Sequence, residues 1–328
     1  MHRSLFKFIV HFLKPYKLLV IAYIICSIVS GMWNIFNSTL LKIIIDTLIH
    51  TETSSNIPRP LLWPSILFLV NLMVYDFSWR GVNIINLKIQ PLIKNDITQY
   101  AFSYISKQTY QFFQNNFAGE ISSNINILSY NIETALNELS VHIIRCSALL
   151  IASLITMYCV NPQFFFGLLA WAIAFLSLSF LPSKTIMKLA AQYAKCGSEV
   201  SGVIVDSISN SQNVRIFARN HFELTNLTKA LLPLRDKFRQ KSVFMLKINI
   251  MRGLSITTLL GFMLYTLTKL IETKDITIGD FGLILTLAIE VAWNVWWLTE
   301  NAYSMINAFG HCRQAINSLF VPLEIEDR

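Results

Sequence analysis

Apolar residues gather in six long stretches along this chain, and polar or charged segments separate them. A helix needs about 20 mostly apolar residues to cross a membrane, so each stretch is long enough to be a transmembrane span. The predicted spans are residues 18–41, 61–79, 139–160, 164–182, 248–268 and 281–299. The pattern therefore predicts an all-α membrane protein with six transmembrane helices.

The connections between the spans differ in length. Those on one side are short, and one is only the turn Asn161-Pro162-Gln163, because Asn-Pro is a turn signal. The two on the other side, residues 80–138 and 183–247, are long and read as helical. A helical hairpin with arms of about 25 residues reaches about 35 Å beyond the bilayer. We therefore expect two long cytoplasmic stalks that continue spans two to five and look like an internal repeat.

The composition also indicates a membrane protein. Apolar residues make up 54% of the 328 residues and charged residues only 14%, with a mean hydropathy of +0.50. Soluble proteins carry about 25% charged residues. These values argue against a soluble domain and against a disordered chain.

The net charge of +8 follows the membrane topology. Twenty-one of the 27 lysine and arginine residues lie in the N-terminal arm, the stalks and the C-terminal tail, and four lie in the opposite connections. Because the side richer in basic residues is cytoplasmic, we expect a multi-pass protein of the plasma (inner) membrane with both termini in the cytoplasm. A role in nucleic-acid binding is disfavoured. The five cysteines have no CxxC spacing, so no metal site or disulfide framework is predicted.

Aromatic residues mark the tips of both predicted stalks. The first tip, residues 110–121, combines them with Asn-Asn and Gly, and the second, residues 212–223, with basic and amide residues. Aromatic side chains at a polar tip suit an interface with a partner protein. The alternative is a helical corner whose aromatic residues pack on the neighbouring stalk.

Several motifs resemble those of the type-1 membrane domain of ABC exporters. Phe113 and Gly119-Glu120-Ile121 look like the family's first cytoplasmic loop, and residues 214–217 with Glu223 look like its second. Further similar segments are Pro15-Tyr16, Leu40-Leu41-Lys42 with Ile45-Asp46, Ile278-Gly279-Asp280, and Pro322-Leu323-Glu324-Ile325, which resembles the linker to a nucleotide-binding domain. Each motif is weak alone, but their order and spacing cover essentially the whole chain.

The resemblance implies the ABC exporter transmembrane fold over residues 18–310, with a cytoplasmic N-terminal arm at 1–17 and a C-terminal linker at 311–328. It also implies a homodimer, or pairing with a homologous half-transporter, that moves by alternating access when ATPase domains close beneath the stalks. The aromatic residues at the polar tips, together with the resemblance, lead us to expect coupling with the ATPase at Phe112, Phe113, Phe117, Gly119, Glu120, Arg215, Phe217 and Glu223.

The chain departs from the family in two respects. Asn124 stands where the first loop usually has a basic residue, and Leu128 where it usually has Asp. The sequence also has no G-x-x-x-x-G-K-[ST] run, the loop that cradles phosphate groups. We therefore expect that the chain is no enzyme by itself and binds no cofactor directly. ATP and Mg are expected on a separate nucleotide-binding ATPase subunit.

Polar residues inside the spans suggest a substrate pathway. Glu290 lies well inside the sixth span, and Trp293, Asn294 and Trp297 share its helical stripe. Because a carboxylate is costly in lipid, we expect this stripe, together with Asn34 of the first span, to line a pathway for an amphipathic or cationic organic molecule. The alternative is an interhelical hydrogen bond that holds the bundle together.

Other ionisable residues in the spans have structural explanations. Asp76 and Arg80 are four residues apart on one helix and are expected to pair. Arg145 and Arg252 lie near span ends, where long side chains can extend to the interface.

Other functions stay open at this point. In one alternative the chain is a truncated, inactive exporter fragment. In another it is a carrier driven by an ion gradient, with Glu290 or Asp76 as the proton site. A membrane-bound enzyme is disfavoured, because no nucleophile, metal site or pair of acids converges.

Overall fold

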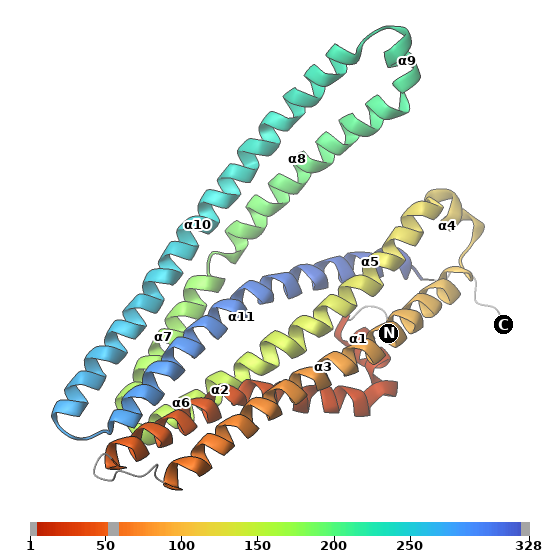
Figure 1. Cartoon of the computed structure of the whole chain (residues 1–328). Coiled ribbons are helices and arrows are strands. Elements are labelled where there is room, and N and C mark those ends of the chain that lie inside the picture. Colours follow the sequence, from red (N-terminus) through yellow and green to blue (C-terminus); the bar gives the residue numbers. More distant parts are fainter. Residues whose placement is uncertain (1–4, 52–58, 323–328) are drawn as a thin grey trace. The chain divides into compact units, whose positions relative to one another are not determined.

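The computed structural model describes residues 5–51 and 59–322, and every secondary-structure element in these ranges is helical (Figure 1). The elements are α1 (Leu5–Leu13), η1 (Lys14–Tyr16), α2 (Lys17–Thr51), α3 (Arg59–Ile105), α4 (Tyr110–Asn115), α5 (Ala118–Asn137), the π-helical η2 (Glu138–Ile144), α6 (Arg145–Val160), α7 (Pro162–Phe180), α8 (Ser183–Ser209), α9 (Ser211–Ile216), α10 (Asn220–Glu272) and α11 (Ile278–Leu319). The predicted all-α class is confirmed. Of the motif that resembles a linker, only Pro322 lies within the described residues.

Within the described residues, six helical segments are long and apolar enough to cross a membrane. They are Lys7–Ile49, Leu61–Ile105, Ala118–Val160, Pro162–Ser209, Asn220–Glu272 and Ile278–Leu319. Each predicted span lies inside one of them, which confirms their number and order. The segments have 42 to 53 residues, whereas about 20 residues cross the hydrocarbon core. The helices are therefore long enough to continue well past the membrane, as predicted for the stalks.

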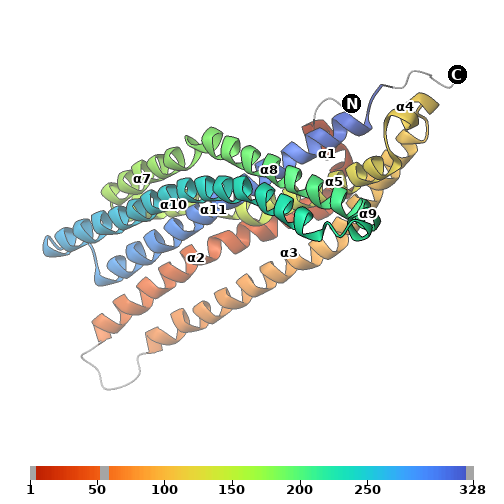
Figure 2. The ribbon, with the colours of Figure 1, turned by 90° about the horizontal axis from the view of Figure 1, so that it is seen from above.

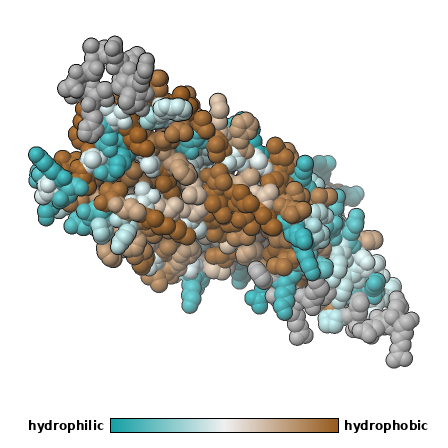
Figure 3. Space-filling view, turned by 90° about the horizontal axis from the view of Figure 1, so that it is seen from below, coloured by the Kyte–Doolittle hydropathy of each residue, from teal (hydrophilic) through white to brown (hydrophobic). Residues whose placement is uncertain are grey.

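Apolar side chains also cover outer surfaces. Figure 3 shows hydrophobic residues across the middle of one face and hydrophilic residues toward its two ends. On α3, the large side chains of Trp63, Leu69 and Phe77 are all exposed. A soluble protein of this size does not expose such a continuous apolar surface, whereas lipid covers it at no cost.

The chain forms two compact units, Met1–Leu169 with Leu260–Arg328, and Ala170–Leu259. In the first unit, α2 lies beside α3 in both ribbon views (Figures 1 and 2). Helix α11 packs against α2, α5 and α6. These helices bring together the polar residues that the sequence places in different spans.

The second unit contains the predicted second stalk as a hairpin of α8 and α10. The rings of Tyr193 and Phe238 lie 5.8 Å apart between these helices, and Lys237 Nζ donates to Gln192 Oε1 at 3.2 Å. The short helix α9 connects the two arms. The helical hairpin predicted for this stalk is confirmed.

Leu128 belongs to the hydrophobic core in which α1, α3, α5 and the end of α11 meet. It is completely buried, as are Ile97, Ala101 and Cys312. An Asp at position 128 would place a charge in this apolar core at a large cost, so Leu suits the position. Leu128, where the sequence departs from the resemblance, therefore contributes to apolar packing.

Aromatic rings fix the end of α11 to the beginning of the chain. The rings of Phe8, Tyr100 and Tyr104 surround Phe320 at centroid distances of 5.1 to 5.7 Å. Tyr104 Oη donates to the backbone oxygen of Val321 at 2.8 Å. Helices α1, α3 and α11 are thus joined where the chain leaves the bundle.

We expect Phe320→Ala to lower the free energy of unfolding by about 3 kcal/mol, the cost of deleting a buried aromatic side chain. Thermal unfolding of the purified protein in detergent measures the change. Phe320→Leu keeps most of the buried apolar volume and should cost less than half as much. Equal loss in the two variants would contradict the role assigned to the rings.

The opposite end of α11 is fastened to α2. Thr277 and Asp280 form a capping box, in which each side chain accepts from the other residue's backbone N–H. Asp46 Oδ1 of α2 accepts from the backbone N–H of Gly279 at 2.9 Å, and Lys42 forms a salt bridge with Asp280. Two motifs that look unrelated in the sequence therefore form one junction.

Asp46→Ala should lower the free energy of unfolding by about 1–3 kcal/mol, because the buried N–H of Gly279 loses its acceptor. The matched control is Asp76→Ala. The predicted pair of Asp76 with Arg80 is confirmed at 2.9 Å, but both side chains are largely exposed, so its loss should cost less than about 1 kcal/mol. Unfolding in detergent compares them, and a larger effect at Asp76 would contradict this ranking.

Candidate functional site

Glu290 lies at a small cavity in the first unit, here called the polar cavity. Its volume is about 140 Å³. Residues of α2, α3, α6 and α11 line it: Ser30, Gly31, Trp33, Asn34, Tyr75, Arg145, Leu149, Glu290 and Asn294. In the described part of the chain, no group of three His, Cys, Asp or Glu side chains could hold a metal ion. The polar cavity is lined by one carboxylate, one guanidinium and the amides of Asn34 and Asn294.

Amide side chains hold both charged groups of the polar cavity. Asn34 Nδ2 donates to Glu290 Oε2 at 3.1 Å, and Arg145 Nη2 donates to Asn294 Oδ1 at 3.2 Å. Asn294 is itself oriented, because its Nδ2 donates to the backbone oxygen of Glu290 at 2.8 Å. Among the described residues, no ion pair within 4.0 Å joins Arg145 to Glu290. The two opposite charges line one cavity and stay separate.

The bond between Asn34 and Glu290 joins α2 to α11, as the structural alternative for Glu290 predicts. That role and a role in a pathway are compatible. A bond that only held the bundle together would need no hollow beside it, whereas here both residues also line the polar cavity.

Gly31 allows α2 to approach α6 closely at this point. A Cβ added to Gly31 would lie 2.5 Å from the backbone oxygen of Arg145 and 3.1 Å from its Cγ. The guanidinium of Arg145 lies over the ring of Trp79 at 5.6 Å, and Cys146 Sγ contacts the backbone oxygen of Asn294 at 3.3 Å. Close helix packing therefore sets the position of the guanidinium.

The structure separates the predicted stripe on α11. Glu290 and Asn294 line the polar cavity, but Trp293 and Trp297 do not, and they are 56% and 59% exposed. Residues that share a stripe on a helical projection can point to different neighbours, because each side chain covers only part of the circumference. A pathway role for the two indoles stays a prediction.

Arg145 and Arg252, which the sequence suggests extend to the interface, both contact side chains of their own unit. Arg145 contacts Trp79 and Asn294 inside the first unit. Arg252, in the second unit, is only 2% exposed and donates to Asn249 Oδ1 at 3.4 Å. Sequence reasoning missed Arg145 as a site residue, although its charge within an apolar span was the available signal.

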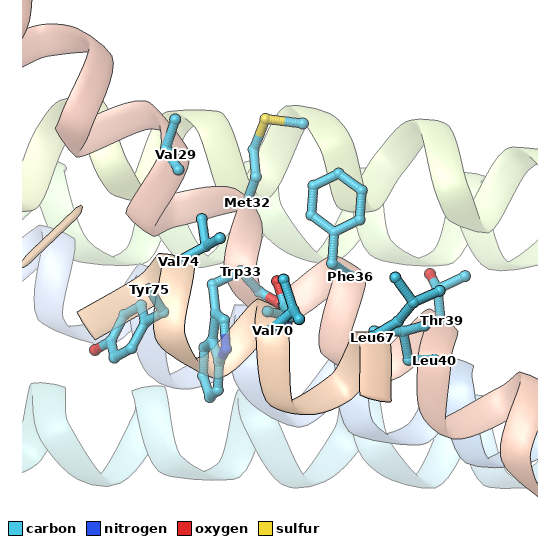
Figure 4. Close-up of a pocket in the computed structure, with 11 residues that line it drawn as sticks. Val29, Met32, Trp33, Phe36, Thr39, Leu40, Leu67, Val70, Val74 and Tyr75 are labelled. Carbon is cyan, nitrogen blue, oxygen red and sulfur yellow. The ribbon is translucent and has the colours of Figure 1, made fainter. Parts of the chain in front are cut away.

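A second, apolar cavity lies between α2 and α3. It has a volume of about 370 Å³, and aliphatic and aromatic side chains form most of its wall. Figure 4 shows Trp33 and Tyr75 at one end, Phe36 near the middle, and Leu67 with Leu40 at the other end. Trp33 and Tyr75, whose ring centroids are 4.6 Å apart, also line the polar cavity. The two cavities therefore adjoin at this pair of rings.

The first stalk tip contains α4 and presents aromatic residues in two directions. Phe112 packs against the hydrophobic core, and its ring contacts Phe113 at 5.6 Å. Phe117 is 83% exposed, and Gly119 and Glu120 are exposed as well. Phe112 thus packs within the first unit, whereas Phe117 is exposed.

The second stalk tip contains α9 and is almost entirely exposed. Arg215 and Phe217 are exposed, Phe217 by 70%, and Glu223 is partly buried. The turn after Phe217 uses Ala218 at φ 50°, a conformation that costs a non-glycine residue energy. The guanidinium of Arg219 lies 5.9 Å from the ring of Phe222. The coupling roles of both tips stay predictions.

Comparison with known proteins agrees with this architecture. The profile of the family described as ABC transporter transmembrane region matches residues 20–294. Among solved structures, the chain is similar to a bacterial Atm1-family ABC exporter with ATP bound, with a TM-score of 0.75 and 14% sequence identity. The match covers 95% of this chain and 55% of that chain, so this chain spans little more than half of the exporter's length. No curated protein matches the sequence. On the extent of the family match and the shared fold, this chain belongs to the ABC transporter transmembrane region family and has the transmembrane fold of ABC exporters.

Proposed function

We propose that this chain is the membrane-spanning subunit of an ATP-driven, exporter-like transporter and forms the substrate pathway as a dimer. The observation that carries the proposal is the polar cavity within this fold, where a carboxylate, a guanidinium and two amides surround a hollow. Charged groups within membrane-spanning helices are costly and commonly serve a function. Because a cavity lies beside these charged groups, the function that we assign to them is binding a polar group of the substrate during transport.

In this proposal the bundle moves by alternating access, as a population shift between inward-open and outward-open forms. A partner can drive such a shift only if it binds the two forms with different affinity. We assign this contact to the tips at α4 and α9, because Phe113, Phe117 and Phe217 are exposed there. ATP and Mg are bound and used on the partner's nucleotide-binding domain, and this chain has no catalytic residue.

The topology of the proposal has both termini in the cytoplasm and the chain in the plasma (inner) membrane. Its support is the charge distribution, since the segments with most lysine and arginine are the arm, the stalks and the tail. The partner subunit would then meet the stalk tips in the cytoplasm, where ATP is available.

Reconstituted transport tests this function. The full chain is isolated from its native membranes with its nucleotide-binding subunit and placed in proteoliposomes. A fluorescent amphipathic probe should accumulate with ATP and Mg but not with a non-hydrolysable ATP analogue. Accumulation that follows a proton gradient without ATP would overturn the proposal in favour of an ion-driven carrier. A chain that stays monomeric in nanodiscs would overturn the dimer.

A further inference from the structure

The polar cavity contains two oppositely charged side chains, Glu290 and Arg145, that form no ion pair within 4.0 Å among the described residues. In a protein interior, opposite charges attract strongly and usually pair when both are desolvated. Here Glu290 is held by Asn34 of α2, and Arg145 by Asn294 of α11. Each charged side chain is therefore hydrogen-bonded to an amide on another helix.

Both charged groups keep hydrogen-bonding capacity toward the cavity. A carboxylate has about four acceptor sites and a guanidinium five donors, while the side chains of Glu290 and Arg145 each make one hydrogen bond within the described residues. A ligand can therefore donate to Glu290 and accept from Arg145 without displacing Asn34 or Asn294.

The two charges restrict which headgroup fits. A purely cationic group at Glu290 is repelled by Arg145, and a purely anionic group at Arg145 is repelled by Glu290. A headgroup that carries both an ammonium and an anionic group satisfies both residues, and it adds no net charge to a small hollow of about 140 Å³.

The apolar cavity provides the second half of the site. It shares Trp33 and Tyr75 with the polar cavity and has a volume of about 370 Å³. Its wall is almost entirely apolar, as a site for a hydrocarbon tail requires. The ring pair places an amphipathic surface at the boundary, where a headgroup meets a tail.

We propose that the adjoining cavities bind a zwitterionic, single-chain amphiphile. Its ammonium lies at Glu290, its anionic group at Arg145, and its tail in the apolar cavity between α2 and α3. This inference rests on the proposed function, since it names the substrate class of the same pathway. It also narrows the class expected from the sequence, which included simple cations.

Binding to the full chain in nanodiscs tests the inference without ATP or a partner. Three radiolabelled probes share a dodecyl tail: dodecyl phosphoethanolamine, dodecylammonium and dodecyl sulfate. Empty nanodiscs correct for partition into lipid. The zwitterion should bind at least tenfold more tightly than either singly charged probe. Equal binding of the three, within twofold, would overturn the inference.

Two charge-neutralising variants should change selectivity in opposite directions. Glu290→Gln should weaken the zwitterion about tenfold and strengthen dodecyl sulfate, and Arg145→Gln should weaken the zwitterion similarly and strengthen dodecylammonium. Arg80→Gln, on an exposed pair outside the cavities, is the matched control and should change nothing. The assignment predicts that each variant changes the order of the three affinities. If both variants weaken all three probes equally, as damage to the fold would do, the assignment is overturned.

Phosphoethanolamine without a tail separates a membrane source of the ligand from a water-soluble source. It should bind at least a hundredfold more weakly than the dodecyl form, and equal affinity would remove the apolar cavity from the site. The proposed function is judged separately, by ATP-driven transport. Selective zwitterion binding without such transport would leave the inference standing, and transport without zwitterion preference would overturn only the inference.

Discussion

Phe217→Ala should abolish ATP-driven transport while leaving a folded, membrane-inserted dimer. The side chain is 70% exposed at the second stalk tip, so its removal costs the fold of this chain little. At a protein interface, truncation of a central aromatic residue costs about 2 kcal/mol or more, and 2.8 kcal/mol corresponds to about a hundredfold loss of affinity. Transport per ATP hydrolysed in proteoliposomes, together with the unfolding temperature, measures the two effects separately.

Phe112→Ala is the matched control on the first tip. Because Phe112 packs against the hydrophobic core, its loss should lower the unfolding temperature first and affect coupling only through the fold. Phe113, which is 44% exposed, should behave more like Phe217. Normal coupling in Phe113→Ala and Phe217→Ala would remove both tips from the contact with the ATPase.

Gly31→Ala should destabilise the bundle and distort the polar cavity at the same time. The new methyl group would lie 2.5 Å from the backbone oxygen of Arg145, closer than any real contact, so α2 and α6 must move apart. Overpacking of this kind costs about 1–3 kcal/mol. The displaced Arg145 loses its alignment with Asn294, and transport should fall at least tenfold. Thermal unfolding and transport rate measure the two consequences.

Gly261→Ala is the control for this substitution. Gly261 also lies in a predicted span, but a Cβ there meets nothing within 4 Å. Alanine favours the helix by up to about 1 kcal/mol relative to glycine, so this variant should be as stable as the original or more so. If both variants behave alike, close approach at Gly31 is not what positions Arg145.

The sequence alone determined the number and order of the apolar segments that are long enough to cross a membrane. The signals used were local ones, each formed by residues that are close together in the sequence. They are the six apolar stretches, the turn at Asn161-Pro162 and the helical pattern of residues 183–247. Such local signals can be recognised without knowing what each helix packs against. For the same reason the pair of Asp76 and Arg80 was predictable, since both residues lie on one helix, four positions apart.

The tertiary structure decided which side chains meet. Glu290 and Asn34 are 256 positions apart, and Arg145 and Asn294 are 149 apart. Nothing along the chain shows that Arg145 turns inward to Asn294 or that the indoles of Trp293 and Trp297 do not line the cavity. The rotation of each helix about its axis is set by close packing, as at Gly31 against Arg145. Hydrophobic periodicity constrains that rotation only weakly when lipid and protein interior are both apolar.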